Sequence, residues 1–296
     1  MTATEPWQWD EPIWRSHIAA AIPGPRLGPV PWPGGAAAAV AISFDSDHET
    51  PALRDGQTSP GVLAQGSYGA RAGVPRLLAV LAKHTIPATF FVPAVSALSY
   101  PEQMRAYVGD GHEVGAHGWI HERTTLLPPG AERELALRAL EAVERTSGVR
   151  PVGMRTPSWD FSPHTLDIAI ELGLLYDSSL MADDEPYELL RDGLPSGLAE
   201  VPVDWIRDDA PYFMMDRYSS LRPYTSPDAV LKIWRDELDG AVGEGGVFQL
   251  TMHPHIIGHR SRIWILDELL GEIRARGLWA TTHADLVRHL TSVPRT

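Results

Sequence analysis

Two histidines, His117 and His121, stand four residues apart in the segment 114–121. If they occupied one helical turn, they would share a face, and both imidazoles could reach one metal ion at about 2.0–2.1 Å. Gly115 and Gly118 would let the backbone turn sharply where a strand ends. A histidine pair at this spacing is a weak signal by itself, so the rest of the chain has to supply the other ligands.

Two aspartates, Asp45 and Asp47, follow the apolar run 37–44. On an extended chain, residues i and i+2 point to the same side, and Ser46 points away. Two carboxylates on one side repel each other unless a cation or a proton lies between them. One of these aspartates together with His117 and His121 would form a three-ligand set with an open position for water, which is typical of a catalytic metal site.

The remaining polar residues fit the same chemistry. The second aspartate would be free to act as a general base, Arg155 could hold it ionised, and His253 could protonate a leaving group or stabilise an oxyanion. A bound metal would lower the pKa of water and polarise a carbonyl, so the set predicts metal-assisted hydrolysis of an amide-like bond. Each residue also has an ordinary interpretation as a turn former, salt-bridge partner or loop residue. Their joint placement after four strands favours the catalytic one.

The elements that must position these residues alternate between strand and helix from residue 36 onward, with about seven strands. Sequential strand–helix units predict a parallel sheet, either open or closed into a barrel, with its site at the carboxyl ends of the strands. Strands are expected at 37–44, 88–92, 113–116, 152–155, 174–178, 198–203, 247–252 and 278–281. Helices are expected at 74–84, 101–110, 128–147, 162–172, 226–242, 263–276 and 284–290.

Two segments lie outside this alternation of strands and helices. Residues 1–35 are rich in proline, glycine and tryptophan, which predicts irregular structure. We expect an N-terminal arm that lies on the body or on a neighbouring subunit, with 36–296 as a single catalytic domain. Residues 50–72 are expected to form a long loop, and loops of this length are often functional.

Composition limits the partners. The chain has 296 residues, a net charge of −13 and no cysteine. An acidic surface repels phosphate backbones, so nucleic acid is excluded as a partner. Without cysteine, a metal site must use His, Asp or Glu. No apolar run approaches the ~18 residues of a membrane span, and no secretory signal is present, so we expect a cytoplasmic protein without a membrane partner.

Four motifs together resemble those of the polysaccharide deacetylase family, also called the NodB-homology family or carbohydrate esterase family four, over roughly residues 38–290. They are Ser43-Phe44-Asp45-Ser46-Asp47, His117-x-x-x-His121, Arg155-x-Pro157 and Leu250-x-x-His253-Pro254. The resemblance implies an α/β fold, a distorted (β/α) barrel of about seven parallel strands. It also implies one divalent metal ion, expected to be zinc. The implied roles are Asp45 as base, Asp47, His117 and His121 as metal ligands, His253 as acid, and Arg155 as the residue that orients Asp45.

One departure makes the substrate uncertain. The usual opening motif has adjacent aspartates, whereas Ser46 separates them here. This spacing and three further segments resemble a subgroup of candidate peptidoglycan deacetylases, cyclic-imide hydrolases and allantoinase-like enzymes, which tend to be homo-oligomers with a lidded site. The substrate contacts expected from those segments are Tyr68, Trp159, Trp205 and Asp208.

Three functions remain open from the sequence. The first is removal of N-acetyl groups from an amino sugar or polysaccharide. The second is hydrolysis of a cyclic imide or allantoin-like ureide, a small cytoplasmic substrate. The third is saccharide binding without catalysis.

Overall fold

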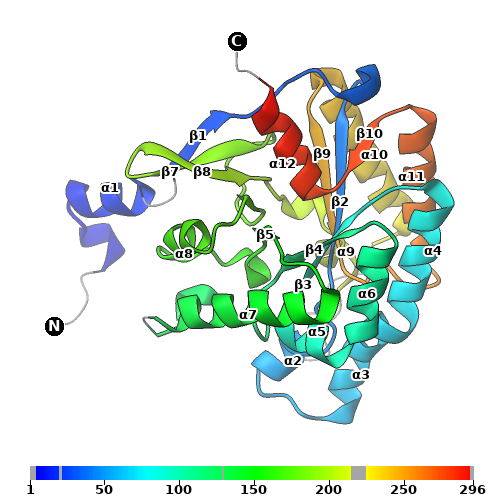
Figure 1. The fold of residues 1–296 in the computed structure, drawn as a ribbon, viewed down its shortest axis with the longest axis horizontal. Coiled ribbons are helices and arrows are strands. Elements are labelled where there is room, and N and C mark those ends of the chain that lie inside the picture. Colours follow the sequence, from blue (N-terminus) through cyan, green and yellow to red (C-terminus); the bar gives the residue numbers. More distant parts are fainter. Residues whose placement is uncertain (1–4, 20–21, 129, 215–224, 294–296) are drawn as a thin grey trace.

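A mostly parallel sheet organises the computed structural model, which describes residues 5–19, 22–128, 130–214 and 225–293. Within these residues ten strands form one sheet, and Figure 1 shows helices around it. The main path of the sheet runs β1 (Ile22–Arg26), β7 (Tyr187–Arg191), β8 (Leu194–Glu200), β6 (Tyr176–Asp177), β5 (Gly153–Met154), β4 (Glu113–Ala116), β3 (Thr89–Val92), β2 (Ala39–Asp45). Strands β9 (Val247–Met252) and β10 (Trp279–Thr281) also pair with β2.

Among the described residues, every strand pairing is parallel except those of β7 with β1 and β8. An isolated parallel bridge between Asp208 and Thr251 joins the segment after β8 to β9, so the two ends of the parallel part approach each other. The predicted α/β fold with a mostly parallel sheet is confirmed.

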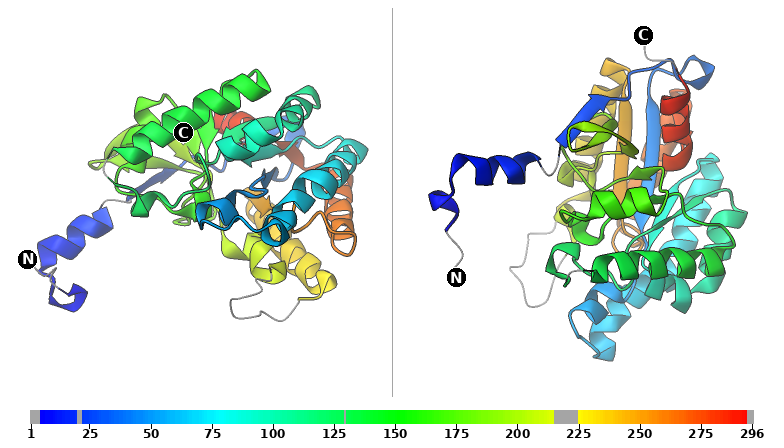
Figure 2. Two further views of the ribbon diagram at one scale, coloured as in Figure 1. Left: turned by 90° about the horizontal axis from the view of Figure 1, so that it is seen from below. Right: turned by 60° about the vertical axis from the view of Figure 1, so that its left-hand side comes forward.

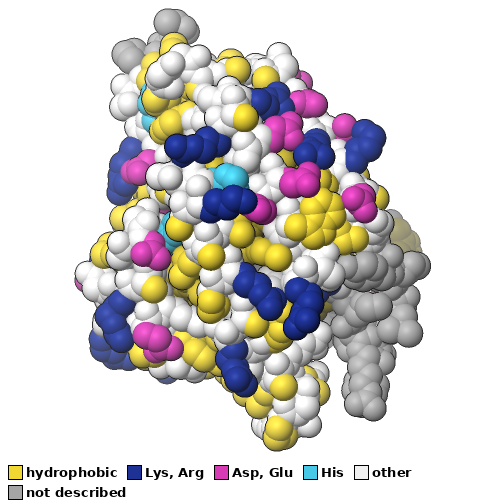
Figure 3. Space-filling model, turned by 90° about the vertical axis from the view of Figure 1, so that its right-hand side faces the viewer, with side chains coloured by type: hydrophobic (Ala, Val, Ile, Leu, Met, Phe, Trp, Pro, Cys, Tyr) yellow, Lys and Arg dark blue, Asp and Glu magenta, His cyan; other side chains and the backbone are white. Residues whose placement is uncertain are grey.

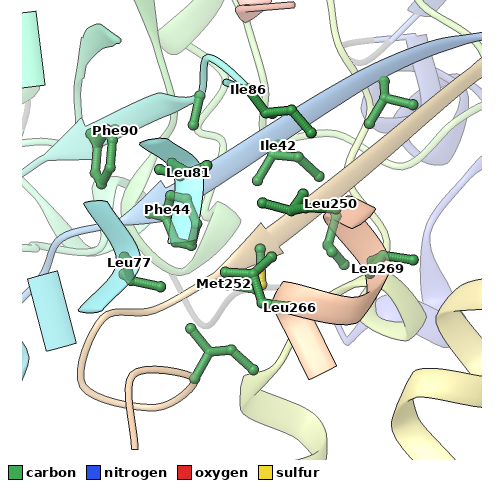
Figure 4. Packing of buried hydrophobic residues seen from close by; sticks show 14 of the residues in the cluster. Ile42, Phe44, Leu77, Leu81, Ile86, Phe90, Leu250, Met252, Leu266 and Leu269 are labelled. Atoms are coloured by element: carbon green, nitrogen blue, oxygen red, sulfur yellow. The ribbon is translucent and has the colours of Figure 1, made fainter. Parts of the chain in front are cut away.

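Strand β2 explains how the core and the site are separated. All seven of its residues are buried. Because side chains alternate along a strand, Val40, Ile42 and Phe44 face one way, and Ser43 and Asp45 face the other. The first set packs against α4 (Val74–His84) and α11 (Ile263–Ala275), as Figure 4 shows. The second set is small or polar, which leaves room for charged side chains inside the sheet.

The helices cover the outer face of the sheet (Figure 1). Besides α4 and α11 they are α5 (Ala94–Ser99), α6 (Pro101–Gly109), α7 (Ala131–Ser147), α8 (Thr165–Glu171), α9 (Ala210–Phe213), α10 (Pro227–Glu244) and α12 (His283–Ser292). Basic and acidic side chains are interspersed over the face that Figure 3 shows. Among the described residues, no helix is both long and apolar enough to cross a bilayer.

Residues 50–72 are helical except for a short connection at 55–59, so the predicted long loop was wrong. Helices α2 (Thr50–Arg54) and α3 (Pro60–Tyr68) lead through a π-helical turn, Gly69–Gly73, directly into α4. Proline at the first turn favours each start, because its missing N–H would have no helical partner there. Glycines that sequence reasoning interpreted as loop residues instead allow close packing: a Cβ at Gly66 would lie 2.2 Å from the His48 carbonyl oxygen.

The N-terminal segment also contains regular structure, contrary to the prediction. Strand β1 pairs antiparallel with β7, and α1 (Glu11–Ala19) precedes it. Figure 2 shows α1 standing away from the body, and none of its residues is buried. Local pattern predicted neither β1 nor β7, and their backbone pairing joins this segment to the sheet.

Candidate metal and catalytic site

The predicted catalytic residues gather around one pocket of about 370 Å³ at the carboxyl ends of the parallel strands. Helices α2 and α3 contribute one of its walls. The pocket is lined by Asp45, Asp47, His117, His121 and His253. Ser46 points to the other side of β2, where its hydroxyl lies 3.3 Å from that of Tyr107. The i, i+2 prediction for the two aspartates is therefore confirmed.

The three predicted ligands form a compact set. Nε2 of His117 lies 3.5 Å from Oδ1 of Asp47, and Nε2 of His121 lies 3.6 Å from Oδ2. One ligand atom from each residue lies within 4.8 Å of the others. Ligands placed at about 2.1 Å around a tetrahedral ion stand about 3.4 Å apart. The spacing of these atoms therefore fits one metal ion.

The two histidines do not lie on a helical turn. His117 follows β4, and the chain then turns through Gly118 and His121, which have φ values of +70° and +63°. The buried carboxylate of Glu122 fixes this turn by accepting hydrogen bonds from the backbone N–H groups of Trp119 and Ile120. The loop brings the imidazole centroids to 5.1 Å from each other, so the two histidines converge through residues with positive φ and not through a shared helical turn.

The protonation of these groups also suits a cation. Nδ1 of His117 donates to the carbonyl of Arg155 at 2.8 Å, which leaves Nε2 free to bind a metal. Burial lowers the pKa of both His117 and His121 and keeps them neutral. Oδ1 of Asp47 is buried without a hydrogen-bond partner, and burial raises the pKa of this carboxyl to about 8. A divalent cation beside Asp47 would supply the missing partner and favour the carboxylate.

Asp45 lies next to the ligands but is held by Arg155. Nη1 of Arg155 donates to Oδ1 of Asp45 at 2.7 Å, and neither side chain is more than 3% exposed. The other carboxylate oxygen lies 3.8 Å from Nε2 of His117. Burial acts to raise the pKa of Asp45, but Arg155 and the nearby histidines outweigh it and bring the pKa below its ordinary value. Asp45 is thus an ionised carboxylate with one oxygen free toward the ligand set.

His253 faces the ligand set from β9. Its Nε2 lies 3.8 Å from Oδ2 of Asp47, and its Nδ1 donates to Asp209 at 2.7 Å. Asp208 is farther away, at 3.5 Å from the same nitrogen. Burial acts to lower the pKa of His253, but Asp208 and Asp209 outweigh it and raise the pKa well above its ordinary value. His253 therefore carries a proton that can be transferred.

Aromatic side chains form another part of the pocket wall. Trp159 and Trp205 both line it, with ring centroids 4.0 Å apart. Trp159 is buried, whereas Trp205 is 48% exposed. The predicted contact Tyr68 is not among the lining residues: its ring stacks on His259, and its hydroxyl accepts from Arg76.

Strained backbone is concentrated around the pocket. Four lining residues other than glycine have positive φ: His48, His121, Ser158 and Trp159. Such conformations are unfavourable for L-residues and persist where the surroundings enforce them, often at functional sites.

Sequence reasoning missed two charged neighbours of the predicted residues. Asp209 was not predicted as a site residue, although besides the His253 imidazole it also accepts from the backbone N–H groups of His253 and Ile257. Arg54 reaches the site from α2, with Nη1 3.1 Å from Nδ1 of His121. The adjacent acids at 208–209 were a usable signal for the first. Nothing local marked Arg54, because it lay in the predicted loop.

Known proteins are similar to this chain in sequence. A family model described as "Polysaccharide deacetylase" matches residues 55–176, which include His117, His121 and Arg155. A peptidoglycan deacetylase from Helicobacter pylori is 31% identical over 242 residues, which are 73% of this chain and 82% of that protein.

Two solved structures are also similar. The first is a candidate polysaccharide deacetylase from Mycobacterium smegmatis, with a TM-score of 0.83 and 36% identity over 93% of this chain and 98% of the other. The second is Puue allantoinase, with a TM-score of 0.78 and 25% identity over 91% and 96%.

Proposed function

Because this chain belongs to the polysaccharide deacetylase family, we propose that it is a metal-dependent hydrolase that removes N-acetyl groups from an amino sugar or polysaccharide. One observation carries this proposal. The set Asp47, His117 and His121 has an ionised carboxylate beside it, Asp45, and a protonated imidazole facing it, His253. A base and an acid beside one ligand set are the parts that hydrolysis of an amide requires.

The metal would be held by Asp47, His117 and His121, and we propose zinc, which favours such nitrogen and oxygen ligands. When bound, it would polarise the acetyl carbonyl and make water more acidic. Asp45 takes the proton from the attacking water through the oxygen that Arg155 leaves free. His253 then donates its proton to the amine nitrogen as the carbon–nitrogen bond breaks, and Asp209 stabilises its charge before that transfer. The products are acetate and the free amine.

The half-exposed ring of Trp205, supported by the buried ring of Trp159, would bind the apolar face of a sugar ring, since an aromatic ring offers contact area at little entropic cost. Asp208 lines the same pocket and would accept a hydrogen bond from a substrate hydroxyl. Tyr68 does not line the pocket, and we assign it no contact with the substrate.

Purified protein tests this proposal directly. It should contain about one zinc per chain by elemental analysis, release acetate from N-acetylglucosamine oligomers, and lose turnover on chelation. Asp45→Asn should abolish turnover and keep the metal, because Asp45 is the base and is not in the ligand set. Full activity of Asp45→Asn would refute the role of Asp45, and turnover without metal would refute the metal site.

A second candidate function is hydrolysis of a cyclic imide or ureide. The similarity to Puue allantoinase favours it, and a pocket of about 370 Å³ bounded on one side by α2 and α3 suits a small substrate. The same base, acid and ligand set would open a ring amide. Loss of hydantoin or succinimide absorbance, measured beside acetate release, separates the two: activity on the oligomers alone would exclude the imide function.

We also propose that the protein is a cytoplasmic homo-oligomer in which the N-terminal arm contacts a second copy. In α1 and the segment before it, Trp7, Ile13, Trp14 and Ile18 are between 38% and 80% exposed. A nine-residue helix is marginal in water unless its apolar side chains are covered. Light scattering on the whole chain and on Trp14→Asp with Ile18→Asp should show an oligomer and its dissociation, and a monomeric whole chain would refute the proposal.

A further inference from the structure

A buried carboxyl group, Glu200, stands behind the site without touching the pocket. Glu200 is the last residue of β8 and is fully buried. Its Oε1 accepts hydrogen bonds from the backbone N–H groups of Ser179 and Leu180, at 2.7 Å and 2.8 Å. These two residues belong to the segment that leaves the short strand β6. Glu200 therefore fixes the course of that segment.

The same segment holds Arg155. Nε of Arg155 donates to the carbonyl of Ser178 at 2.8 Å, and Nη2 donates to the Ser178 hydroxyl at 2.8 Å. The Ser178 hydroxyl in turn donates to the carbonyl of Val201, the residue after Glu200. The backbone N–H of Thr156 donates to the Ser179 hydroxyl. Two sides of the guanidinium are thus bound by Ser178, and the segment 178–180 is held by the end of β8.

The third side of the guanidinium is hydrogen-bonded to Asp45. Nη1 donates to Oδ1 of Asp45 at 2.7 Å and to the Ser43 hydroxyl at 3.0 Å. A planar guanidinium that is bound on three sides cannot rotate without losing hydrogen bonds in the interior. The position of Asp45 therefore depends on the position of Ser178, and through it on Glu200.

We propose that Glu200 is a positioning residue for the base Asp45, acting through Ser178 and Arg155; this inference rests on the proposed function. Glu200 does not line the pocket and touches no reacting atom.

Asp177 shows which property of Glu200 matters. It lies directly across from Glu200 in the parallel register, and both side chains are fully buried. Two adjacent buried carboxyls cannot both ionise cheaply, so the pair holds a proton. Burial raises the pKa of Asp177 to about 6 and that of Glu200 well above its usual range. A glutamine at 200 would keep an acceptor for the two N–H groups and offer a donor to Asp177, so the amide should replace the acid.

Steady-state kinetics of the metal-loaded enzyme test the inference. Glu200→Ala should lower kcat at least tenfold, change KM less than threefold and leave the metal content at the wild-type value. Glu200→Gln should restore kcat to within threefold of wild type. An unchanged kcat in Glu200→Ala, or a loss of kcat in Glu200→Gln as large as that in Glu200→Ala, would overturn the inference.

Glu185 offers a matched control. It is also buried, and it accepts from a backbone N–H, that of Val247, but this lies at the first residue of β9, away from the carboxyl ends that form the site. Glu185→Ala should keep kcat within twofold of wild type. An equal loss of kcat in Glu185→Ala and Glu200→Ala would show a general effect of buried carboxyls and overturn the inference.

If Glu200→Ala does not fold, Ser178→Ala can be measured in its place. This substitution removes one hydrogen bond of Arg155 and should lower kcat severalfold. An unchanged kcat in Ser178→Ala would also overturn the inference. These outcomes are separable from a failure of the proposed function, which would appear as an inactive wild type or a fully active Asp45→Asn.

Discussion

Gly73→Ala should impair both stability and turnover, because two backbones meet where the methyl group would go. Gly73 ends the π-helical turn before α4, and a Cβ there would lie 2.1 Å from the carbonyl oxygen of Pro254. Carbon and oxygen in contact stand about 3.3 Å apart or more, so one backbone would have to retreat by about 1 Å. Overpacking of this kind costs about 1–3 kcal/mol of folding free energy.

The same displacement should reach the chemistry. Pro254 directly follows His253, whose imidazole lies between Asp209 and the ligand set. A misplacement of about 1 Å at a reacting group can cost roughly 100-fold in rate. We therefore expect a loss of kcat of between 10-fold and 100-fold in Gly73→Ala, estimated from that limit.

Urea unfolding and steady-state kinetics measure both effects, and Gly109→Ala is the matched control. Gly109 lies in α6, and a Cβ there would meet nothing within 4 Å. Alanine in a helix is favoured over glycine by roughly 0.5–1 kcal/mol, so Gly109→Ala should be slightly stabilised with unchanged kcat. If Gly73→Ala is as stable and active as Gly109→Ala, the close approach of the two backbones is refuted.

Three further predictions concern single side chains. Burial acts to lower the pKa of His253, but Asp208 and Asp209 raise it, so Asp209→Asn should lower this pKa. The alkaline limb of the pH profile of kcat/KM should then move to lower pH. A limb that does not move would contradict the role of His253 as the acid. Burial raises the pKa of Glu185 from 4.5 to about 7, so its contribution to stability is present below pH 4.5 and is lost as the pH rises through 7. In urea unfolding, the loss of unfolding free energy in Glu185→Gln relative to wild type should therefore be larger at pH 5 than at pH 8. Equal losses at the two pH values would argue against the raised pKa. Trp205→Ala should raise KM on saccharide oligomers severalfold with little change in kcat. The reason is that Trp205 is 48% exposed in the pocket wall and is not hydrogen-bonded to Asp45, His253 or the metal ligands. A fall in kcat alone would refute its role as a binding surface.

Local pattern was sufficient for the parallel part of the fold. The apolar runs placed β4 and β9 as observed, and helical spacing placed α4 at 74–84. Period-2 alternation on β2 also predicted that Asp45 and Asp47 share a side, because side-chain direction along a strand depends only on the backbone. The resemblance to the family came from these motifs, and the comparisons confirm it.

Segments with weak or contradictory local signals were predicted wrongly. Glycines and prolines at 50–72 indicate a loop when read in sequence, but in the structure the prolines lie at helix starts and the glycines allow close approach to His48 and His255. Strands β1 and β7 were missed for a related reason, since their pairing supplies order that neither strand's sequence indicates. In both cases tertiary contacts outweighed local propensity.

The sequence by itself determined which residue types stand at the strand ends, and with them the class of chemistry. The expected contact of Arg155 with Asp45 is present, but only the tertiary structure decided that Asp209 holds His253 and that Glu200 holds the segment that positions Arg155. The reason is physical. Side-chain periodicity follows from the local backbone, whereas a hydrogen bond between residues more than 20 positions apart depends on the register and packing of the strands between them.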